Sequence, residues 1–381
     1  MITVTLLQPG RIVFGEGCAA NCTEFLAQKA VTRVLLVTCR SVSPQLQFLR
    51  DALQGHSCEL VGTLIIKPEP TKVDFEQALE TARAARPQAV LGVGGGSALD
   101  VAKLIAALVN GRQKIDEIFG INLLAGRDLL LVCLPTTAGT GSEVSPNAVL
   151  LDEAAQLKKA VISPHLVPDA AFIDPRLTLS VPPSVTAATG MDALTHCIEG
   201  YANKSAHPIV DVYALEGIRR ISANLLRAVR NGADLEARTQ VLLGSLYGGL
   251  CLGPVNTAAV HALSYPLGAR FHVAHGVSNA VLLPHVLNFN LPEAPQRYRD
   301  VAVALGANGV DEVEALGRSG VSLIAKLSRD CGVPQRLADF GIPKDAIPDM
   351  ARSAMQVTRL LKNNVRSLTE EDAIQIYEAS Y

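Results

Sequence analysis

The hydrophobic positions change their pattern about halfway along the chain. In the first part, short and continuous apolar runs at 34–37, 89–93 and 129–134 alternate with segments of helical periodicity, such as the amphipathic segment 71–85. Short apolar runs bounded by helix breakers are typical of strands that are buried on both faces of a parallel sheet. We therefore expect a Rossmann-like α/β domain, with helices on both faces of the sheet.

After about residue 180, apolar residues recur with helical spacing as far as the C-terminus. The clearest helical segments, separated by proline and glycine, are 184–204, 207–230, 234–252, 258–270 and 275–290. The sequence Leu179-Ser180-Val181-Pro182-Pro183 marks the change of pattern. We expect two domains, an α/β domain at 1–180 and an all-α domain at 181–381, for which 381 residues supply enough apolar material.

Composition and charge narrow the possible functions. Only 18% of the residues are charged, the net charge is −2, and the basic residues are scattered, which argues against a nucleic-acid partner. There is no apolar run long enough to span a membrane, and the first residues lack the basic start of a signal peptide. None of the eight cysteines forms a CxxC pair, so we expect buried thiols and a cytoplasmic protein.

A glycine-rich turn follows the apolar run 89–93. Gly92-Val93-Gly94-Gly95-Gly96-Ser97 precedes a helical segment. Glycine allows a ligand to approach the backbone closely, and a helix N-terminus presents free N–H groups to an anion such as pyrophosphate. The spacing departs from the GxGxxG fingerprint, because Ser97 takes the place of the third glycine. A tight turn without a ligand therefore remains an alternative.

A second loop, Pro135–Glu143, follows the run 129–134 and combines hydroxyl side chains with glycines. On its own, this loop could be a polar connection between strands. Two such loops after two parallel strands would lie side by side at the carboxyl edge of the sheet, where ligands bind in open α/β sheets. The pair favours a dinucleotide site.

Four residues of the second half form a candidate metal site. Asp192 and His196 are four residues apart, so a helix would project both from one face, and His261 and His275 lie on later helical segments. Three imidazoles and one carboxylate suit Fe(II) or Zn(II). Spacing alone leaves an alternative, since a histidine in an apolar helix is more often a hydrogen-bonded core residue.

Together these motifs resemble the iron-containing (group III) alcohol dehydrogenase family, which has a dehydroquinate synthase-like fold. The resemblance runs from about residue 10 to the C-terminus, and its most specific parts are the glycine turn, the loop Pro135–Glu143 and the segment 186–196. It implies that Asp192, His196, His261 and His275 hold the metal and that Asn147 and Leu252 line the substrate pocket. The cofactor-binding residues that it implies are Gly95, Gly96, Ser97, Asp100, Thr136, Thr137, Thr140 and Lys158.

Two departures from the family pattern concern specificity. Members that prefer NAD usually carry an aspartate after the first strand, where this chain has Cys39 and Arg40. Because Arg40 could pair with a 2′-phosphate, we expect NADP(H) to be accepted, although a solvated Arg40 and NAD binding are an equal alternative. Tyr265 replaces a histidine found in many members and is a candidate catalytic residue with a hydroxyl that can donate.

The resemblance implies a metal-dependent alcohol dehydrogenase or aldehyde reductase that transfers hydride between NAD or NADP and a small alcohol or aldehyde. The implied metal is Fe(II), with Zn(II) as the alternative, and a homodimer is usual for the family. Tyr265 also resembles the hydroxyacid-oxoacid transhydrogenase branch. Weaker alternatives are a dehydroquinate synthase-type lyase and a protein that binds metal and nucleotide without turnover.

Overall fold

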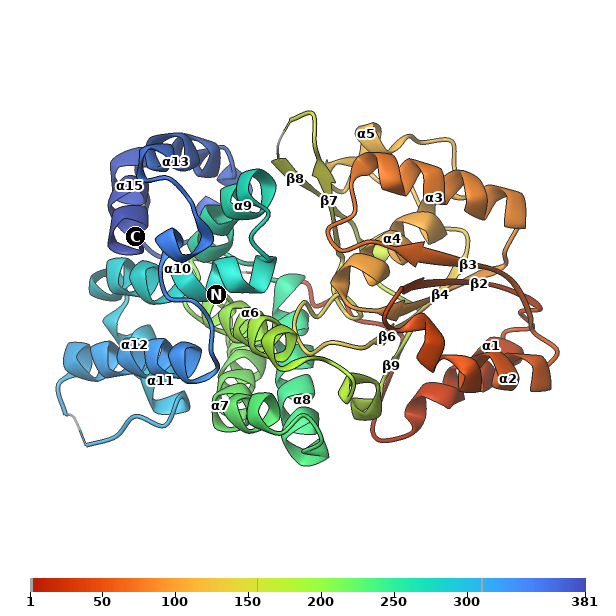
Figure 1. Cartoon of the computed structure of the whole chain (residues 1–381), viewed down its shortest axis with the longest axis horizontal. Coiled ribbons are helices and arrows are strands. Elements are labelled where there is room, and N and C mark those ends of the chain that lie inside the picture. The colour runs from red at the N-terminus through yellow and green to blue at the C-terminus, as the bar shows by residue number, and fades with distance from the viewer. Residues whose placement is uncertain (1–2, 156, 310) are drawn as a thin grey trace. The chain divides into compact units, whose positions relative to one another are not determined.

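The computed structural model describes residues 3–155, 157–309 and 311–381. Contacts between Cα atoms divide the chain into two compact units. The α/β unit consists mainly of Leu7–Thr137 and Gly141–Leu179, and the helical unit consists mainly of Ser180–Tyr381 together with Ala138–Thr140. Figure 1 shows their elements.

The α/β unit is built on a six-stranded sheet in which all neighbouring strands are parallel. In their order across the sheet, the strands are β1 (Arg11–Phe14), β9 (Ala170–Ile173), β6 (Leu130–Pro135), β4 (Ala89–Gly94), β2 (Arg33–Cys39) and β3 (Glu59–Ile66). β2, β4 and β6 contain the three apolar runs of the first half. The prediction of a parallel sheet is confirmed.

Helices cover both faces of this sheet, and the side chains of β2 show how. Leu35 and Val37 pack in a core with residues of α3 (Lys72–Ala85) and α4 (Gly96–Leu108). On the other face, Val34 and Leu36 pack with residues of α1 (Asn21–Gln28) and α2 (Gln47–Gly55). Because successive strand residues point to opposite faces, a strand between two helical layers is apolar throughout.

The sequence did not predict a second, three-stranded sheet in the α/β unit. It consists of β5 (Gly120–Ile121), β8 (Leu157–Ile162) and β7 (Asn147–Asp152), and α5 (Ile115–Ile118) precedes it. β7 and β8 are antiparallel and form the pair labelled in Figure 1. Lys158 and Lys159 interrupt the apolar pattern of β8. A search for continuous apolar runs therefore missed this strand.

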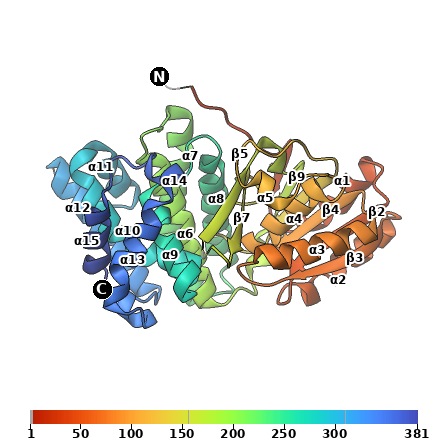
Figure 2. The same cartoon turned by 90° about the horizontal axis from the view of Figure 1, so that it is seen from above.

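The helical unit contains no strand within the residues that the structure describes. Its main helices, several of which are labelled in Figure 2, are α6 (Pro183–Tyr201), α7 (Pro208–Arg230), α8 (Leu235–Leu252), α9 (Ala259–Phe271), α10 (His275–Asn290), α11 (Pro295–Ala304), α12 (Val313–Asp330), α13 (Ile347–Met355), α14 (Thr358–Leu361) and α15 (Glu370–Ala379). The first five match the predicted segments within three residues. The fold class, a Rossmann-like α/β domain followed by an all-α domain, is confirmed. Among the described helices, none combines the length and apolarity that a membrane span requires.

Glycines allow α6, α7 and α8 to pack closely. A Cβ added at Gly190 of α6 would lie 2.2 Å from Leu225 of α7, and one added at Gly217 of α7 would lie 2.4 Å from Cys197 of α6. Real Cβ atoms do not approach other atoms so closely. The close packing fixes α6, which carries two of the candidate metal ligands, in the middle of the helical core.

Candidate functional site

The four candidate metal ligands converge within the helical unit. Asp192 and His196 lie one turn apart on α6, His261 lies on α9, and His275 is the first residue of α10. Oδ1 of Asp192 is 3.8 Å from Nε2 of His196, 3.5 Å from Nε2 of His261 and 3.7 Å from Nε2 of His275. The first three side chains are buried, whereas the side chain of His275 is 29% exposed.

This arrangement fits a divalent cation. Four ligands placed tetrahedrally at the usual bond length of about 2.1 Å are separated from one another by about 3.4 Å. The separations of 3.5 to 3.8 Å between Asp192 and the three imidazoles are close to this value. Three imidazole nitrogens and one carboxylate oxygen are a donor set that suits Fe(II) and Zn(II).

Hydrogen bonds on Nδ1 orient two of the imidazoles. Nδ1–H of His261 donates to Oε2 of Glu199 over 2.6 Å, and the other carboxylate oxygen of Glu199 accepts from the N–H of Val260 over 2.6 Å. Nδ1 of His196 faces the carbonyl oxygen of Gly139 at 3.3 Å. A donor proton on Nδ1 leaves the lone pair on Nε2 for a cation.

The sequence interpretation missed Glu199. A signal was present, because this residue follows Asp192 and His196 on the same face of α6, at a spacing of four and then three residues. Glu199 is buried, with 4% of its surface exposed. A buried glutamate beside a histidine is the usual partner of a metal-binding imidazole.

The pKa values of Asp192 and His261 are shifted by the charges of their neighbours in the cluster. Burial raises the pKa of Asp192, but the positive charges of His196, His275 and His261 outweigh burial and hold this pKa well below its usual range. Burial lowers the pKa of His261, but Glu199 and Asp192 raise it to about 10. The ionised carboxylate of Asp192 therefore favours a positive charge in this buried cluster, whether a proton on an imidazole or a metal cation.

Asn279 is a second residue that the sequence interpretation missed. It lies on α10 one turn after His275 and is completely buried. Its Nδ2 atom donates to Oδ1 of Asp192 over 2.7 Å and lies 3.1 Å from Nε2 of His261 and 3.4 Å from Nε2 of His275. One amide nitrogen therefore contacts three of the four candidate ligand atoms.

Gly276 determines how closely α10 approaches α6. A Cβ added at this position would lie 2.2 Å from the carbonyl oxygen of Ala188 and 3.3 Å from Cβ of Asp192. Only a glycine fits without moving one of the two helices. The separation between His275 and Asp192 therefore depends on this residue.

The two loops that suggested a dinucleotide site lie side by side in the α/β unit. Gly94, at the end of β4, pairs with Pro135, at the end of β6. The N–H of Thr136 donates to the carbonyl oxygen of Gly94 over 2.9 Å, and a Cβ added at Gly95 would lie 3.3 Å from Oγ1 of Thr137. This arrangement is the one that the sequence predicts.

The glycine turn begins α4 at the carboxyl edge of the sheet. Gly95 is the N-cap of α4, and Gly96 and Ser97 are its first two residues. The first N–H groups of a helix have no partner within it, and the helix dipole favours an anion there. The contacts of Gly95, Gly96 and Ser97 with a pyrophosphate remain a prediction.

Lys158 belongs to the same cluster in the α/β unit. Its Nζ lies 2.8 Å from Oε1 of Glu69, and the N–H of Glu69 donates to Oγ of Ser97 over 3.3 Å. The ammonium group is thus held beside the start of α4. A contact of Lys158 with the cofactor remains a prediction.

Asp100 connects α4 to residues that follow it in the chain. Its Oδ1 accepts from the hydroxyl of Ser142 over 2.5 Å, and its Oδ2 accepts from the N–H of Val149 over 2.9 Å. The buried Lys103 donates to the carbonyl oxygens of Ser145 and Asn147 over 2.9 and 2.8 Å. Asp100 therefore anchors the second loop, and its predicted role in cofactor binding is untested.

The remaining predicted cofactor residues are Cys39 and Arg40, together with Thr140. Cys39 ends β2, which neighbours β4 in the sheet, and the side chain of Arg40 is exposed. Seven cysteines are buried free thiols, as predicted, but the prediction is wrong for Cys39, which is partly exposed. It is less covered because it lies at the strand end, beside Ser41. Thr140 lies in the segment that clusters with the helical unit.

Tyr265 lies one turn after His261 on α9. Its ring centroid is 6.3 Å from that of His275, and its hydroxyl accepts a hydrogen bond from Nη2 of Arg359 over 2.8 Å. The hydroxyl proton of Tyr265 remains available for donation.

Leu252, which the family resemblance places in the substrate pocket, is buried at the end of α8.

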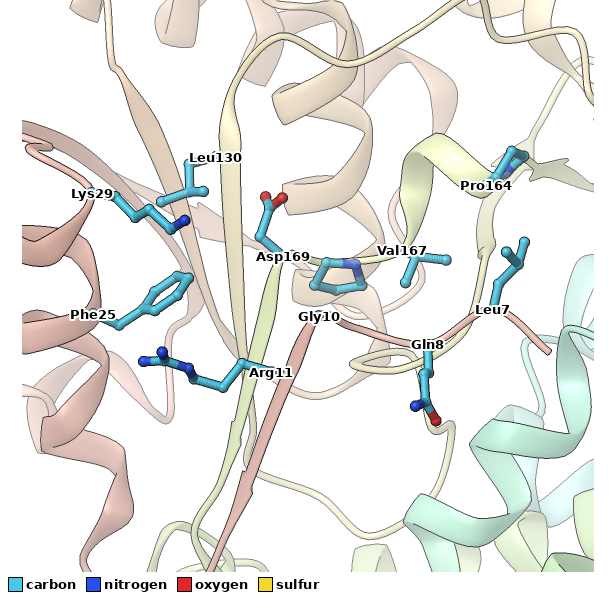
Figure 3. A pocket seen from close by; sticks show the side chains of 11 residues that line it. Leu7, Gln8, Gly10, Arg11, Phe25, Lys29, Leu130, Pro164, Val167 and Asp169 are labelled. Carbon is cyan, nitrogen blue, oxygen red and sulfur yellow. The ribbon is translucent and has the colours of Figure 1, made fainter.

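Figure 3 shows a cavity of about 470 Å³ at the opposite edge of the sheet. Arg11 and Leu130, which line it, are the first residues of β1 and β6, and Asp169 directly precedes β9. Ligands of open α/β sheets bind at the carboxyl ends of the strands. This cavity at the amino ends is therefore not the dinucleotide site.

Comparisons with known proteins agree with this description. Residues 9–175 match the family model "Iron-containing alcohol dehydrogenase", and residues 186–381 match the model of the C-terminal part of the Fe-containing alcohol dehydrogenase family. The chain is 42% identical to long-chain-alcohol dehydrogenase 1 of Geobacillus thermodenitrificans over 333 residues, which cover 86% of this chain and 83% of the relative. It is 34% identical to the 1,3-propanediol dehydrogenase of Klebsiella pneumoniae over 379 residues, which cover 97% and 94%.

Solved structures show the same fold. A 1,3-propanediol oxidoreductase superposes with a TM-score of 0.96 at 31% identity, with both chains fully covered. An NADH-dependent butanol dehydrogenase of Thermotoga maritima superposes with a TM-score of 0.90 at 26% identity and covers 100% of this chain and 99% of its own. The family predicted from the sequence is confirmed: the chain belongs to the iron-containing alcohol dehydrogenases and is an NAD-dependent oxidoreductase of alcohols and aldehydes.

Proposed function

We propose that Asp192, His196, His261 and His275 hold one divalent cation, with Fe(II) favoured over Zn(II) by the family, and that a small alcohol or aldehyde reacts beside it. The observation that carries this proposal is that Oδ1 of Asp192 lies 3.5 to 3.8 Å from Nε2 of all three histidines. Asp192, His261 and His275 form the tightest group, with ligand atoms within 4.8 Å of one another, and His196 approaches it through Asp192. A cation in such a site supplies Lewis acidity toward the substrate oxygen, and the nicotinamide supplies or accepts the hydride.

The chain's own side chains prepare this chemistry. Glu199 accepts a hydrogen bond from Nδ1–H of His261, so that Nε2 of this ring is directed toward the cluster and can bind a cation. Burial of Asp192, His196 and His261 excludes water from the ligands. Tyr265 offers its hydroxyl proton to a substrate oxygen, and the charged hydrogen bond from Arg359 makes this hydroxyl a better donor.

We also propose that residues 1–180 bind the dinucleotide and that residues 181–381 hold the metal and the substrate. Gly95, Gly96 and Ser97 would bind the pyrophosphate, with Lys158 beside them. Thr136, Thr137 and Thr140 would line the nicotinamide, and Cys39 and Arg40 would lie toward the adenosine. The position of the glycine turn at the carboxyl edge of β4, next to β2 and β6, supports this assignment.

The exposed Arg40 supports the acceptance of NADP(H) as well as NAD(H). Its guanidinium is free to meet a 2′-phosphate after β2, where family members that prefer NAD usually carry a carboxylate. We expect Arg40→Ala to raise KM for NADPH by about tenfold and to leave KM for NADH within about twofold, since one charged hydrogen bond contributes about 1.5 kcal/mol or more. Equal effects on both cofactors would contradict this assignment.

A second candidate function is hydride transfer between a hydroxyacid and an oxoacid. The observation that favours it is the guanidinium of Arg359 at the hydroxyl of Tyr265, since arginine is suited to bind a substrate carboxylate. Such a transhydrogenase would convert a mixture of hydroxyacid and oxoacid without free NADH appearing in solution. Release of NADH with simple alcohols would instead support the dehydrogenase.

A substrate panel with both cofactors tests the proposal. Nicotinamide absorbance would be followed with short and long alcohols, aldehydes, diols and hydroxyacids, and the same preparations would undergo elemental analysis. We expect turnover with neutral alcohols or aldehydes in preparations that contain iron or zinc. Turnover that continues at the full rate after complete removal of metal would overturn the proposed role of the cluster.

We further propose that the enzyme acts in the cytoplasm as a homodimer. The free thiols of the described chain support a reducing compartment, because exposed and buried cysteines persist unpaired there. The homodimer rests on the family resemblance. Light scattering of the purified protein would test it, and a mass equal to one chain would refute it.

A further inference from the structure

We propose that Glu69 holds Lys158 in the cofactor-free protein and that a dinucleotide must take Lys158 from Glu69 in order to bind. Glu69 thereby weakens cofactor binding and speeds cofactor release. The inference rests on the proposed dinucleotide site at the start of α4. It goes beyond that site by assigning a role to a carboxylate that opposes the bound pyrophosphate.

The ion pair between Lys158 and Glu69 is close and sheltered from water. Nζ of Lys158 lies 2.8 Å from Oε1 of Glu69, and the side chain of Lys158 is only 9% exposed. Within the part of the chain that the structure describes, Glu69 is the only carboxylate paired with Lys158. A charge that is shielded from water interacts more strongly with its neighbours than one on the open surface. Glu69 is therefore the negative partner of Lys158 until another anion replaces it.

Glu69 also contacts the glycine turn. Its N–H donates to Oγ of Ser97 over 3.3 Å, and Ser97 is the second residue of α4. The free N–H groups and the dipole at the start of a helix attract an anion. A pyrophosphate bound at this turn would be a second anion beside the ammonium group of Lys158, and it would compete with Glu69 for that group.

The backbone of Glu69 has an unfavourable conformation. Its φ of +48° lies in the left-handed region, which is costly for a residue with a Cβ and is occupied mostly by glycine and asparagine. The residue stands between two prolines, and the carbonyl oxygen of Pro70 accepts from the N–H of Leu151 of β7 over 3.0 Å. Backbone preference does not explain a glutamate here, so its carboxylate must be what the position uses.

A purely structural ion pair is the alternative, and the two roles predict opposite changes in cofactor affinity. If Glu69 only stabilised this part of the fold, its removal would disturb Lys158 and weaken cofactor binding. If Glu69 competes with the pyrophosphate, its removal frees Lys158 and strengthens cofactor binding. A gain of affinity is a result that structural damage does not produce.

Two variants remove the carboxylate in different ways. Glu69→Gln keeps the length of the side chain, and Glu69→Asn introduces a residue that tolerates the left-handed conformation. Glu59→Gln is the control, because Glu59 is the first residue of β3 and pairs with Arg33, the first residue of β2, over 3.0 Å at the amino edge of the sheet. It changes the net charge equally, at the opposite end of the strands. Lys158→Met tests the proposed contact of Lys158 with the cofactor.

The measurements are the dissociation constant of NADH with the full chain, from a fluorescence titration, and the release rate of NADH, from stopped-flow displacement. The chain contains no tryptophan that would add to the signal. We expect both Glu69 variants to lower the dissociation constant by about three- to tenfold and to slow release by a similar factor. Glu59→Gln should bind NADH within about twofold of the wild type, and Lys158→Met should bind it about tenfold more weakly.

Three results would overturn the inference and leave the dinucleotide site in place. The first is unchanged or weaker NADH binding by both Glu69 variants while Lys158→Met weakens binding. The second is an equal gain in Glu59→Gln, because net charge alone would then explain the effect. The third is a gain in Glu69→Asn only, which would trace it to the backbone. If Lys158→Met binds NADH as tightly as the wild type, the proposed contact of Lys158 fails, and the inference fails with it.

Discussion

Replacing Gly276 with alanine tests the idea that close packing of α10 on α6 determines the separation of the metal ligands. The new Cβ would lie 2.2 Å from the carbonyl oxygen of Ala188, which is a backbone atom and cannot rotate away. An ordinary contact needs about 3.5 Å, so the start of α10 must move by roughly 1 Å. His275 is the neighbouring residue and would move with it, away from Asp192.

The magnitude of this effect follows from the tolerance of metal sites. Metal–ligand distances vary by only about 0.2 Å around their usual values, so a shift of roughly 1 Å removes one ligand from an effective position. We expect the metal dissociation constant to rise by more than about tenfold, which corresponds to about 1.4 kcal/mol. Overpacking should also lower the free energy of unfolding by about 1–3 kcal/mol.

The assay is metal binding by competition with a chelator, together with unfolding in urea. Gly55→Ala is the control, because Gly55 ends α2 and an added Cβ there has no atom within 4 Å. The control should bind metal like the wild type and unfold at nearly the same urea concentration. Wild-type metal affinity in Gly276→Ala would show that the packing of these helices does not control the ligand geometry.

The remaining predictions concern single side chains. Glu199→Gln replaces the carboxylate that orients His261 and should weaken metal binding by about 10- to 100-fold, as measured by chelator competition; unchanged affinity would count against its role. Tyr265→Phe should lower kcat/KM by about three- to tenfold if the hydroxyl donates to the substrate, and unchanged kinetics would show that it does not. Burial raises the pKa of Glu143 to about 7. Between about pH 4.5 and 7 the folded chain therefore keeps this proton while the unfolded chain loses it. The free energy of unfolding falls as the pH rises through this range. Glutamine has no such proton to lose. In urea unfolding, the free energy of unfolding of Glu143→Gln should therefore rise relative to that of the wild type by up to about 3 kcal/mol between pH 5 and pH 8. A difference between the two proteins that does not change with pH would contradict the raised pKa.

The sequence was sufficient for the features that depend on periodicity. Continuous apolar runs identified β2, β4 and β6, and the 3.6-residue spacing identified α6 to α10. The pairing of Gly94 with Pro135 followed from the rule that parallel strands end at one edge. β8 was missed because the adjacent Lys158 and Lys159 interrupt its apolar pattern, and continuous apolar runs were the criterion. β7 does contain such a run at residues 148–151, and it was not assigned to a strand from the sequence.

The candidate ligands were recognised from their types and from the family resemblance, but their supporting residues were not. Glu199 shares one face of α6 with Asp192 and His196, so its place on that helix could have been inferred. Its contact with His261 and the contact of Asn279 with Asp192 arise only because α6, α9 and α10 pack together, and spacing along one helix gives no distance between helices. The role of Gly276 was hidden for the same reason, since a close approach of two backbones leaves no side-chain pattern.

The central claim is that Asp192, His196, His261 and His275 hold the cation on which hydride transfer depends. The most direct measurement is a titration of Fe(II) and of Zn(II) into chelator-treated wild-type and His261→Ala protein, in which bound metal and aldehyde-dependent NADH oxidation are measured in the same samples. We predict that wild-type activity rises in proportion to bound metal up to a single cation per chain, and that His261→Ala retains neither metal nor activity. Full activity without bound metal, or wild-type activity in His261→Ala, would contradict the claim.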